Sequence, residues 1–226
     1  MPEFKREPWK KPEEVKSLNI SGKPAEKHNI FVDHKELGGG IFGKVFIGSL
    51  RFKDGKRRRV AIKKFFGAIS DKDVEEYRKI IYGLKAADLP VLKTDFVKLP
   101  TGEWVQVQEL FGGTERGSKF LDSLALHGLH SYEEIKDIVD KEIELTIKVA
   151  NLGYSPHPDM FVITETGGVY IGDFDSLKPG DFSLGFAIDF FHNTFGGECL
   201  NAFKIALEWF GSAELKQAWK SYLASK

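Results

Sequence analysis

The chain has 226 residues, 42% of them hydrophobic, and its 33 basic residues balance 33 acidic ones. This length and composition predict a folded protein with a full apolar core, either as one two-lobed unit or as two small lobes. We expect no membrane span and no secretory signal, because no long apolar run and no charged-then-apolar leader is present. The single cysteine, Cys199, excludes an internal disulfide and a cysteine-cluster metal site, and it favours a cytoplasmic protein.

The N-terminal part of the chain is basic. Residues 1–64 contain 17 lysines and arginines against 8 acidic residues, a net charge of +9. Residues 1–27, rich in Pro, Lys and Glu, are interpreted as a basic arm that wraps the first lobe or is partly disordered. The charge is consistent with a polyanionic partner, either ATP alone or a nucleic acid as well, and equally with an ordinary lysine-rich surface.

A glycine-rich turn follows the first predicted strand. Alternating apolar residues predict strands at 28–32, 45–50 and 60–65, and the turn between the first two has the spacing G-x-G-x-x-G. Lys63 closes the sequence Val60-Ala61-Ile62-Lys63 on the third strand. This arrangement indicates a hairpin that covers nucleotide phosphates and a lysine that reaches them; a plain tight turn is the alternative. The residues expected to line the nucleotide are Gly38, Gly39, Gly40, Ile41, Phe42, Gly43, Val45, Ala61 and Lys63.

The strongest positive cluster, Lys56-Arg57-Arg58-Arg59, follows a hairpin-turn signal at Asp54-Gly55. Alternate side chains of the three arginines should face solvent. Because ATP needs only the glycine turn and Lys63, we expect the arginines to contact an anionic acceptor such as RNA. The alternative is a solvated hairpin.

The remaining pattern predicts helices and further strands. Ser70 can cap a helix that buries Val74, Tyr77, Ile81 and Leu84. A strand pair is expected at 91–99 and 104–110, a helix at 131–151 opened by the capping-box spacing of Ser131 and Glu134, a hairpin at 161–164 and 169–172, and two helical stretches after residue 187.

The sequence Ile171-Gly172-Asp173-Phe174-Asp175 resembles the D-F-G motif in its D-F-D form. Together with the glycine turn and Lys63, it makes residues 37–177 similar to the protein-kinase-like superfamily. The resemblance implies a compact bilobal α+β fold: an antiparallel-sheet N-lobe with one helix at 28–110, a hinge near 109–113, and a mostly helical C-lobe at 111–226. It also implies ATP and Mg²⁺ as cofactors, with Asp173 as a metal ligand and Asp175 as a second one.

The same resemblance implies further roles around the nucleotide. Glu76 would pair with Lys63 and hold it over the phosphates. The alternatives are that Asp73 pairs with Lys63, or that Glu76 is an ordinary solvent-exposed carboxylate of the helix. Free backbone groups between Glu109 and Phe111 would pair with adenine.

The expected catalytic loop departs from the family pattern. In the preferred register, His157-Pro158-Asp159-Met160 matches H-P-x-N, so Ser155 replaces the usual catalytic aspartate and Met160 the metal-binding asparagine. A second register, with His157 and Asp159 as the family's H-x-D, leaves too short a loop before Asp173. Three outcomes stay open: Asp159 orients the acceptor hydroxyl, His157 acts on the γ-phosphate, or the protein binds ATP without catalysis. His157 also fits a purely structural hydrogen bond.

Only 51 residues follow Asp175, and no A-P-E motif occurs among them, which argues against a conventional regulated protein kinase. Among small RIO-like kinases the chain resembles the archaeal family labelled predicted Ser/Thr kinases, which includes an RNA kinase; the low Gln and Asn content is thermophile-like. That resemblance implies an ATP-dependent kinase acting on a ribose 2′-hydroxyl of tRNA. A Ser/Thr protein kinase with a protein substrate and a non-catalytic ATP-binding subunit are the alternatives.

Overall fold

A computed structural model of the chain describes residues 13–18, 26–39, 42–52, 55–99, 101–110, 121–122, 128, 130–164, 167–175, 177–179 and 184–224. The chain divides into two compact units. The first consists of Met1–Ser70 and Lys93–Leu110, and the second of Asp71–Leu92 and Phe111–Lys226. The expected α+β class is confirmed, since an antiparallel sheet forms the first unit and helices form most of the second.

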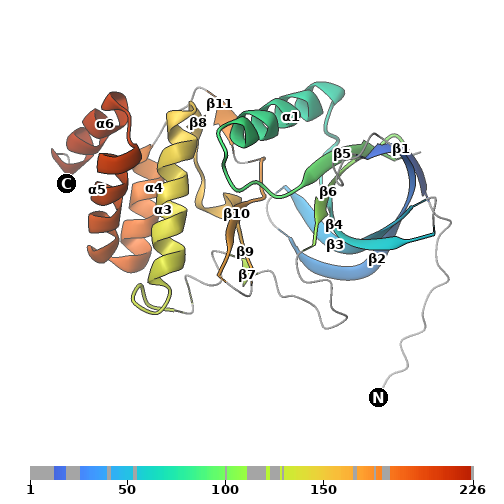
Figure 1. Cartoon of the computed structure of the whole chain (residues 1–226), viewed down its shortest axis with the longest axis horizontal. Coiled ribbons are helices and arrows are strands. Elements are labelled where there is room, and N and C mark those ends of the chain that lie inside the picture. Colours follow the sequence, from blue (N-terminus) through green and yellow to red (C-terminus); the bar gives the residue numbers. More distant parts are fainter. Residues whose placement is uncertain are drawn as a thin grey trace, which may run out of the picture. The chain divides into compact units, whose positions relative to one another are not determined.

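The first unit is built on a six-stranded antiparallel sheet in the order β1-β2-β3-β4-β6-β5 (Figure 1). The sheet curls so far that its two edge strands, β1 and β5, contact each other. The prediction missed β1, which lies within the expected arm and pairs with β2. The strands are β1 (Glu13–Leu18), β2 (Glu26–Gly39), β3 (Gly43–Arg51), β4 (Arg57–Phe65), β5 (Thr94–Lys98) and β6 (Trp104–Glu109).

The two faces of this sheet differ in character because side chains alternate along each strand. We call the face with the apolar cluster the core face; its buried side chains are Ile30, Leu50, Val60, Ile62, Val97, Leu99, Val105 and Val107. The opposite face, here the outer face, carries Arg59, Ala61 and Lys63 of β4. The period-two pattern of β4 therefore separates Lys63 from the apolar core of its own sheet.

Helix α1 (Asp71–Ala86) begins directly after Ser70 and buries Val74, Ile81 and Leu84, as the apolar spacing predicts. It groups with the second unit, whereas residues 28–110 were expected to form one lobe. Residues 71–92 group with the second unit because backbone hydrogen bonds join the end of this segment to β10 (Val169–Ile171). Leu92 N–H donates to Ile171 O, and Ile171 N–H donates to Pro90 O.

Gly83 also allows α1 to pack closely against the rest of the second unit. A Cβ at Gly83 of α1 would lie 3.0 Å from the Tyr154 hydroxyl, so the missing side chain lets that ring approach the helix. The division at residues 110 and 111 coincides with the expected end of the first lobe.

Four helices pack together in the second unit: α3 (Lys136–Asn151), α4 (Leu184–Phe195), α5 (Glu198–Phe210) and α6 (Ala213–Ala224) (Figure 1). Aromatic rings fill the space among α4, α5 and α6. Phe203 meets Phe191 edge-on at 5.6 Å between centroids and stacks on Trp219 at 6.2 Å. Such offset and edge-on pairs add to the burial that holds helices together.

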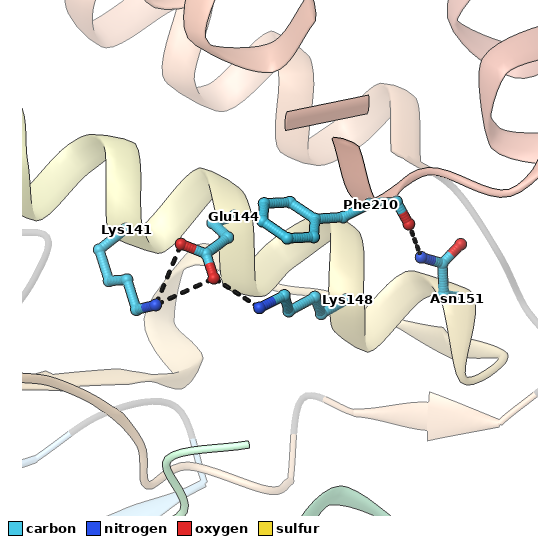
Figure 2. Close-up of polar contacts among 5 residues, drawn as sticks. All are labelled: Lys141, Glu144, Lys148, Asn151 and Phe210. Carbon is cyan, nitrogen blue, oxygen red and sulfur yellow. Dashed lines mark hydrogen bonds and ion pairs between the residues drawn. The ribbon is translucent and has the colours of Figure 1, made fainter. Parts of the chain in front are cut away.

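The junction of α5 and α6 is fixed to the end of α3, as Figure 2 shows. The Asn151 amide nitrogen donates to Phe210 O. The amide oxygen accepts the Ser212 N–H at 3.0 Å. The Lys148 ammonium lies 4.2 Å from the centroid of the Phe210 ring, a cation–π contact. Glu144, one turn earlier on α3, accepts hydrogen bonds from Lys148 and from Lys141.

Short strands lie beside the helices. The predicted hairpin is confirmed as β9 (Phe161–Ile163) and β10 (Val169–Ile171), and β7 (Leu121–Asp122) pairs with β9. Before this hairpin, β8 (Tyr154–Ser155) pairs with β11 (Lys178–Pro179), and the 3₁₀ turn η1 (Pro158–Met160) leads into β9.

Two predictions for the helical part were wrong in detail. The helix expected from residue 131 begins at Lys136, because Glu134 accepts the Ser131 N–H and hydroxyl and so stabilises a turn at 132–134. The two stretches expected after residue 187 are three helices, because Gly196-Gly197 and Gly211 interrupt the apolar pattern. None of the described helices has the length and apolar character needed to cross a bilayer.

Candidate functional site

The glycine turn joins β2 to β3, with Gly38 paired to Val45 and Gly39 to Lys44. Its third glycine has a structural reason: a Cβ at Gly43 would lie 2.3 Å from the Lys64 backbone oxygen, so only glycine lets β3 approach β4 here. A Cβ at Gly38, by contrast, would meet nothing within 4 Å. The tip residues Gly40 and Ile41 lie outside the described residues.

Phe42 lies at the start of the returning strand and is about half exposed. Its backbone oxygen accepts a hydrogen bond from the Phe66 N–H at 3.0 Å, which ties the turn to the end of β4. The part of the hairpin that carries Phe42 is therefore anchored to the strand that bears Lys63.

Three residues expected to line a nucleotide share the outer face of the sheet. Val45 is the direct cross-strand partner of Lys63, and Ala61 lies two residues before Lys63 on the same strand. Buried Gln106 of β6 is the partner of Lys63 on the other side. The Lys63 side chain is 8% exposed, and its ammonium lies 5.8 Å from the centroid of the Phe65 ring. A lysine so desolvated is well suited to a phosphate ligand, because burial strengthens its electrostatic interactions.

The structure limits the role expected for Glu109, whose pairing with adenine through another backbone group stays a prediction. Its N–H donates to Lys93 O at 2.9 Å, so this backbone group is not available to adenine. Its side chain accepts the Lys93 N–H at 3.0 Å and lies 3.4 Å from an Arg58 nitrogen. The Glu109 carboxylate therefore joins β4, β6 and the approach to β5. Phe111 lies outside the described residues.

The arginine cluster is divided between the two faces of β4. Arg58 is paired across the strands with Leu50, on the core face, and its charge is matched by Glu109. Arg57 and Arg59 are exposed on the outer face, and the Arg57 guanidinium lies 5.7 Å from the centroid of the Phe31 ring. The expectation that alternate arginines face solvent is confirmed, whereas Arg58 is a structural ion-pair residue.

Helix α1 places three acidic residues differently. Glu76 is exposed and lies 3.8 Å from Lys72, and Glu75 pairs with Lys79 at 3.0 Å, both as neighbours one turn apart. Asp73 is half-buried on the side of the helix that also carries Tyr77. The pairing of Glu76 with Lys63 stays a prediction.

The structure brings His157 and Asp159 into contact, which was not predicted from the sequence. The Asp159 carboxylate contacts His157 Nδ1, and the Asp159 N–H lies 3.4 Å from the same nitrogen. One nitrogen cannot both donate and accept, and the carboxylate contact is the shorter. We therefore assign the proton to Nδ1, which leaves the Nε2 lone pair of the neutral ring as an acceptor. The exposed Phe186 ring stacks on the imidazole at 5.0 Å and fixes its plane.

Backbone hydrogen bonds join this histidine loop to the D-F-D motif. The Met160 oxygen accepts the N–H of Gly172 at 2.9 Å and that of Asp173 at 3.2 Å. A Cβ at Gly172 would lie 2.6 Å from Val162, so glycine is required for this approach. The described structure thus brings Asp173 beside His157 and Asp159. Met160, where the resemblance implies an asparagine, is fully buried, and Ser155 lies in β8.

The two carboxylates of the D-F-D motif lie on one turn. Asp173 is half-buried, and its Oδ1 accepts the Asp175 N–H at 3.3 Å; Asp175 is buried. Nearby, the pKa of Tyr77 is raised to about 12, first by burial and then by the negative charges of Asp175 and Asp73. The part of this shift that comes from the carboxylates reflects negative charge near the turn, which a bound cation would offset.

This donor set fits Mg²⁺ of the kind bound with nucleotide phosphates. No cluster of three or more acidic, histidine or cysteine side chains suited to a metal occurs among the residues the structure describes. Mg²⁺ in phosphate-binding sites takes one or two carboxylates and completes its octahedral shell with phosphate oxygens and water. Asp173 and Asp175 are oxygen donors of that kind, whereas the buried thioether of Met160 is not.

Sequence reasoning missed two side chains of this site. Tyr77 was assigned to the apolar face of α1, although its hydroxyl lies in the field of the D-F-D carboxylates. Phe186 carried no signal, because its stacking on His157 depends on how α4 packs against the histidine loop. No known family model matches the chain, and no curated protein matches it.

Proposed function

We propose that this protein is an ATP-dependent kinase that transfers the γ-phosphate to a hydroxyl acceptor. The observation that carries the proposal is the shared acceptor at Met160 O, which brings Asp173 beside the His157–Asp159 pair. A metal-binding carboxylate and an oriented imidazole are two of the groups that phosphoryl transfer uses. The chain order of glycine turn, strand lysine and D-F-D motif supports the same function.

In this proposal the residues have separate roles. Lys63 neutralises phosphate charge, and Asp173 and Asp175 hold Mg²⁺, which supplies charge neutralisation to the transferred phosphoryl group. His157 Nε2 accepts the proton of the acceptor hydroxyl as its oxygen bonds to phosphorus and the bond to ADP breaks. Asp159 keeps the imidazole in the tautomer that can accept this proton and stabilises the imidazolium that results.

The acceptor we propose is a ribose 2′-hydroxyl of tRNA. The resemblance to small archaeal kinases and the net charge of +9 over residues 1–64 support this choice. The experiment is transfer of label from γ-labelled ATP by the full chain, with total tRNA and total protein offered in parallel. We expect labelled tRNA and no label with Lys63→Ala.

The possible outcomes separate the parts of the proposal. Label in protein alone would retain the kinase and reject the tRNA acceptor. Label in neither, with no consumption of ATP, would reject the kinase. Lys63→Ala with near-normal transfer would reject the assigned site.

A non-catalytic nucleotide-binding protein is the second candidate. Complete burial of Met160 and the absence of a carboxylate at Ser155 favour it, because two groups of the family pattern are then missing. Binding of labelled ATP without turnover on any acceptor would decide for this candidate.

A further inference from the structure

Three arginines of the first unit gather on one face of the sheet. Arg51 at the end of β3 is the direct cross-strand partner of Arg57, so their side chains leave the sheet on the same side with Cβ atoms about 5 Å apart. Arg59, two residues after Arg57, lies on that side as well. All three side chains are exposed. We call this group, Arg51, Arg57 and Arg59, the arginine face.

The arginine face has no matching acidic partner in the part of the chain that the structure describes. Among the described residues no carboxylate forms an ion pair with Arg51, Arg57 or Arg59, whereas Arg58 on the other side of β4 is paired with Glu109. Three like charges this close repel one another, which disfavours the cluster unless something else compensates it. The difference within one run of arginines points to a ligand for the exposed members.

The arginine face continues the outer face that carries Lys63. Arg59, Ala61 and Lys63 alternate along β4, which puts Arg59 about 13 Å from Lys63 along the strand. Ser49 is the cross-strand partner of Arg59, and it adds a hydroxyl rather than an opposing charge. An extended polyanion lying along β4 would meet several cations in succession.

We propose that the arginine face binds the phosphate backbone of RNA. This inference deepens the proposed function, since it assigns the acceptor's chemical class to a surface. Arginine presents a planar fork that binds phosphate oxygens in pairs, and Arg57 is already oriented by its contact with the Phe31 ring. Closely spaced cations on one strand suit the regular phosphates of a nucleic acid, and residues 1–64 add a favourable field.

The test measures binding of the full chain to a fluorescein-labelled oligouridylate of about 20 nucleotides across a salt series, without ATP. The variant is the triple substitution Arg51→Gln, Arg57→Gln and Arg59→Gln. Loss of three phosphate contacts should flatten the slope of log affinity against log salt by about two units, and should weaken binding at least tenfold at low salt. Binding of a fluorescent ATP analogue should change less than about twofold.

Three controls test the position of the charges and the chemistry of the ligand. The triple substitution Lys85→Gln, Lys204→Gln and Lys220→Gln removes three exposed charges from helices of the second unit and should leave the RNA slope unchanged. Arg58→Gln removes a neighbouring charge from the core face and should lower the unfolding temperature with little effect on the slope. A poly-glutamate peptide of about the same length, which offers carboxylates in place of phosphates, should bind much more weakly than the RNA.

The inference is overturned if the arginine-face variant and the wild type give equal slopes. The inference is also overturned if the lysine control loses as much of the salt slope as the arginine-face variant, or if the wild type binds poly-glutamate as tightly as RNA. These outcomes are distinct from failure of the kinase. RNA binding that survives Asp173→Asn while phosphate transfer is lost would support both proposals. Transfer to a non-RNA acceptor without RNA binding would retain the kinase and reject the tRNA acceptor together with this inference, whereas transfer to tRNA with equal salt slopes in the wild type and the arginine-face variant would reject the inference alone.

Discussion

His157 is held on two sides, by the Asp159 carboxylate at Nδ1 and by the Phe186 ring against its flat surface. These two contacts restrict the orientation of the imidazole, and they leave Nε2 as the ring nitrogen that can contact a ligand. The sequence predicted both residues but left the division of roles open. In the mechanism that we propose, Asp159 orients the imidazole and His157 accepts the proton.

The first prediction tests this assignment. His157→Ala should lower turnover by about 10²–10⁴-fold, the usual range for a positioned acid or base, and Asp159→Asn should lower it by removing the oriented tautomer. Ser155→Ala, in β8, should change turnover by less than about threefold. Steady-state rates with matched unfolding curves measure this. Damage by Ser155→Ala while the other two variants stay active would contradict it.

A second residue-scale prediction concerns Cys199. Burial raises the pKa of its thiol to about 11, and the thiol donates to Gly196 O. A raised folded pKa means that the neutral thiol stabilises the fold below the unfolded pKa, near 9, and that this contribution is lost as the pH rises towards 11.

Alkylation with iodoacetamide measures this directly, because Cys199 is the only cysteine. At pH 8 the native thiol should react at least about 100-fold more slowly than the unfolded one, since the thiolate fraction falls tenfold with each pKa unit. Equal rates in native and denatured protein would show that the thiol is neither buried nor shifted.

At the scale of elements, the glycine turn contains glycines with different physical reasons. Gly43 is required by the backbone of β4, whereas Gly38 has open space where a Cβ would stand. A sequence motif gives both glycines the same weight. The strand register, with Gly43 opposite Phe65 and beside Lys64, shows that Gly43 is needed for packing of the two strands. The motif alone does not distinguish a glycine needed for packing from one that leaves room for a ligand.

The third prediction compares two substitutions in this turn. Gly43→Ala should cost about 1–3 kcal/mol of unfolding free energy through overpacking against Lys64 O. Gly38→Ala should change stability by less than about 1 kcal/mol and should weaken ATP binding, because its methyl group would occupy the approach of a phosphate. Urea unfolding and nucleotide titration of both variants measure this. Unchanged ATP affinity in Gly38→Ala would count against the phosphate-binding turn.

At the scale of the whole molecule, the α+β class and most elements followed from periodicity. β4, α1 and the β9–β10 hairpin were predictable because their apolar residues recur at strand or helix spacing. Strand β1 was not, because its pairing with β2 depends on the curl of the whole sheet rather than on its own charged sequence. The grouping of α1 with the second unit likewise depends on contacts of Gly83, Pro90 and Leu92 with residues far along the chain.

In the candidate site too, features within local motifs were predictable from the sequence, whereas contacts between distant segments were not. Residue types at fixed spacing made Lys63, Asp173, His157 and Asp159 candidates, since these positions lie within local motifs, but the contact between His157 and Asp159 was not predicted. The motif did not predict that Glu109 would use its N–H and carboxylate within the sheet, because this depends on pairing across β4 and β6. Side chains contributed by distant elements, such as Phe186, are beyond local patterns for the same reason.

The most direct test of the proposed kinase is the Mg²⁺ dependence of γ-phosphate transfer from ATP in the wild type and in Asp173→Asn. The wild type should be active with Mg²⁺ and inactive with excess chelator. Asp173→Asn, which removes a ligand charge but keeps the shape, should lose at least about 10²-fold at moderate Mg²⁺ and recover partly as Mg²⁺ is raised. Identical Mg²⁺ curves and rates for the two proteins would contradict the assignment of Asp173 as the metal ligand, and absence of transfer by the wild type with Mg²⁺ would contradict the kinase.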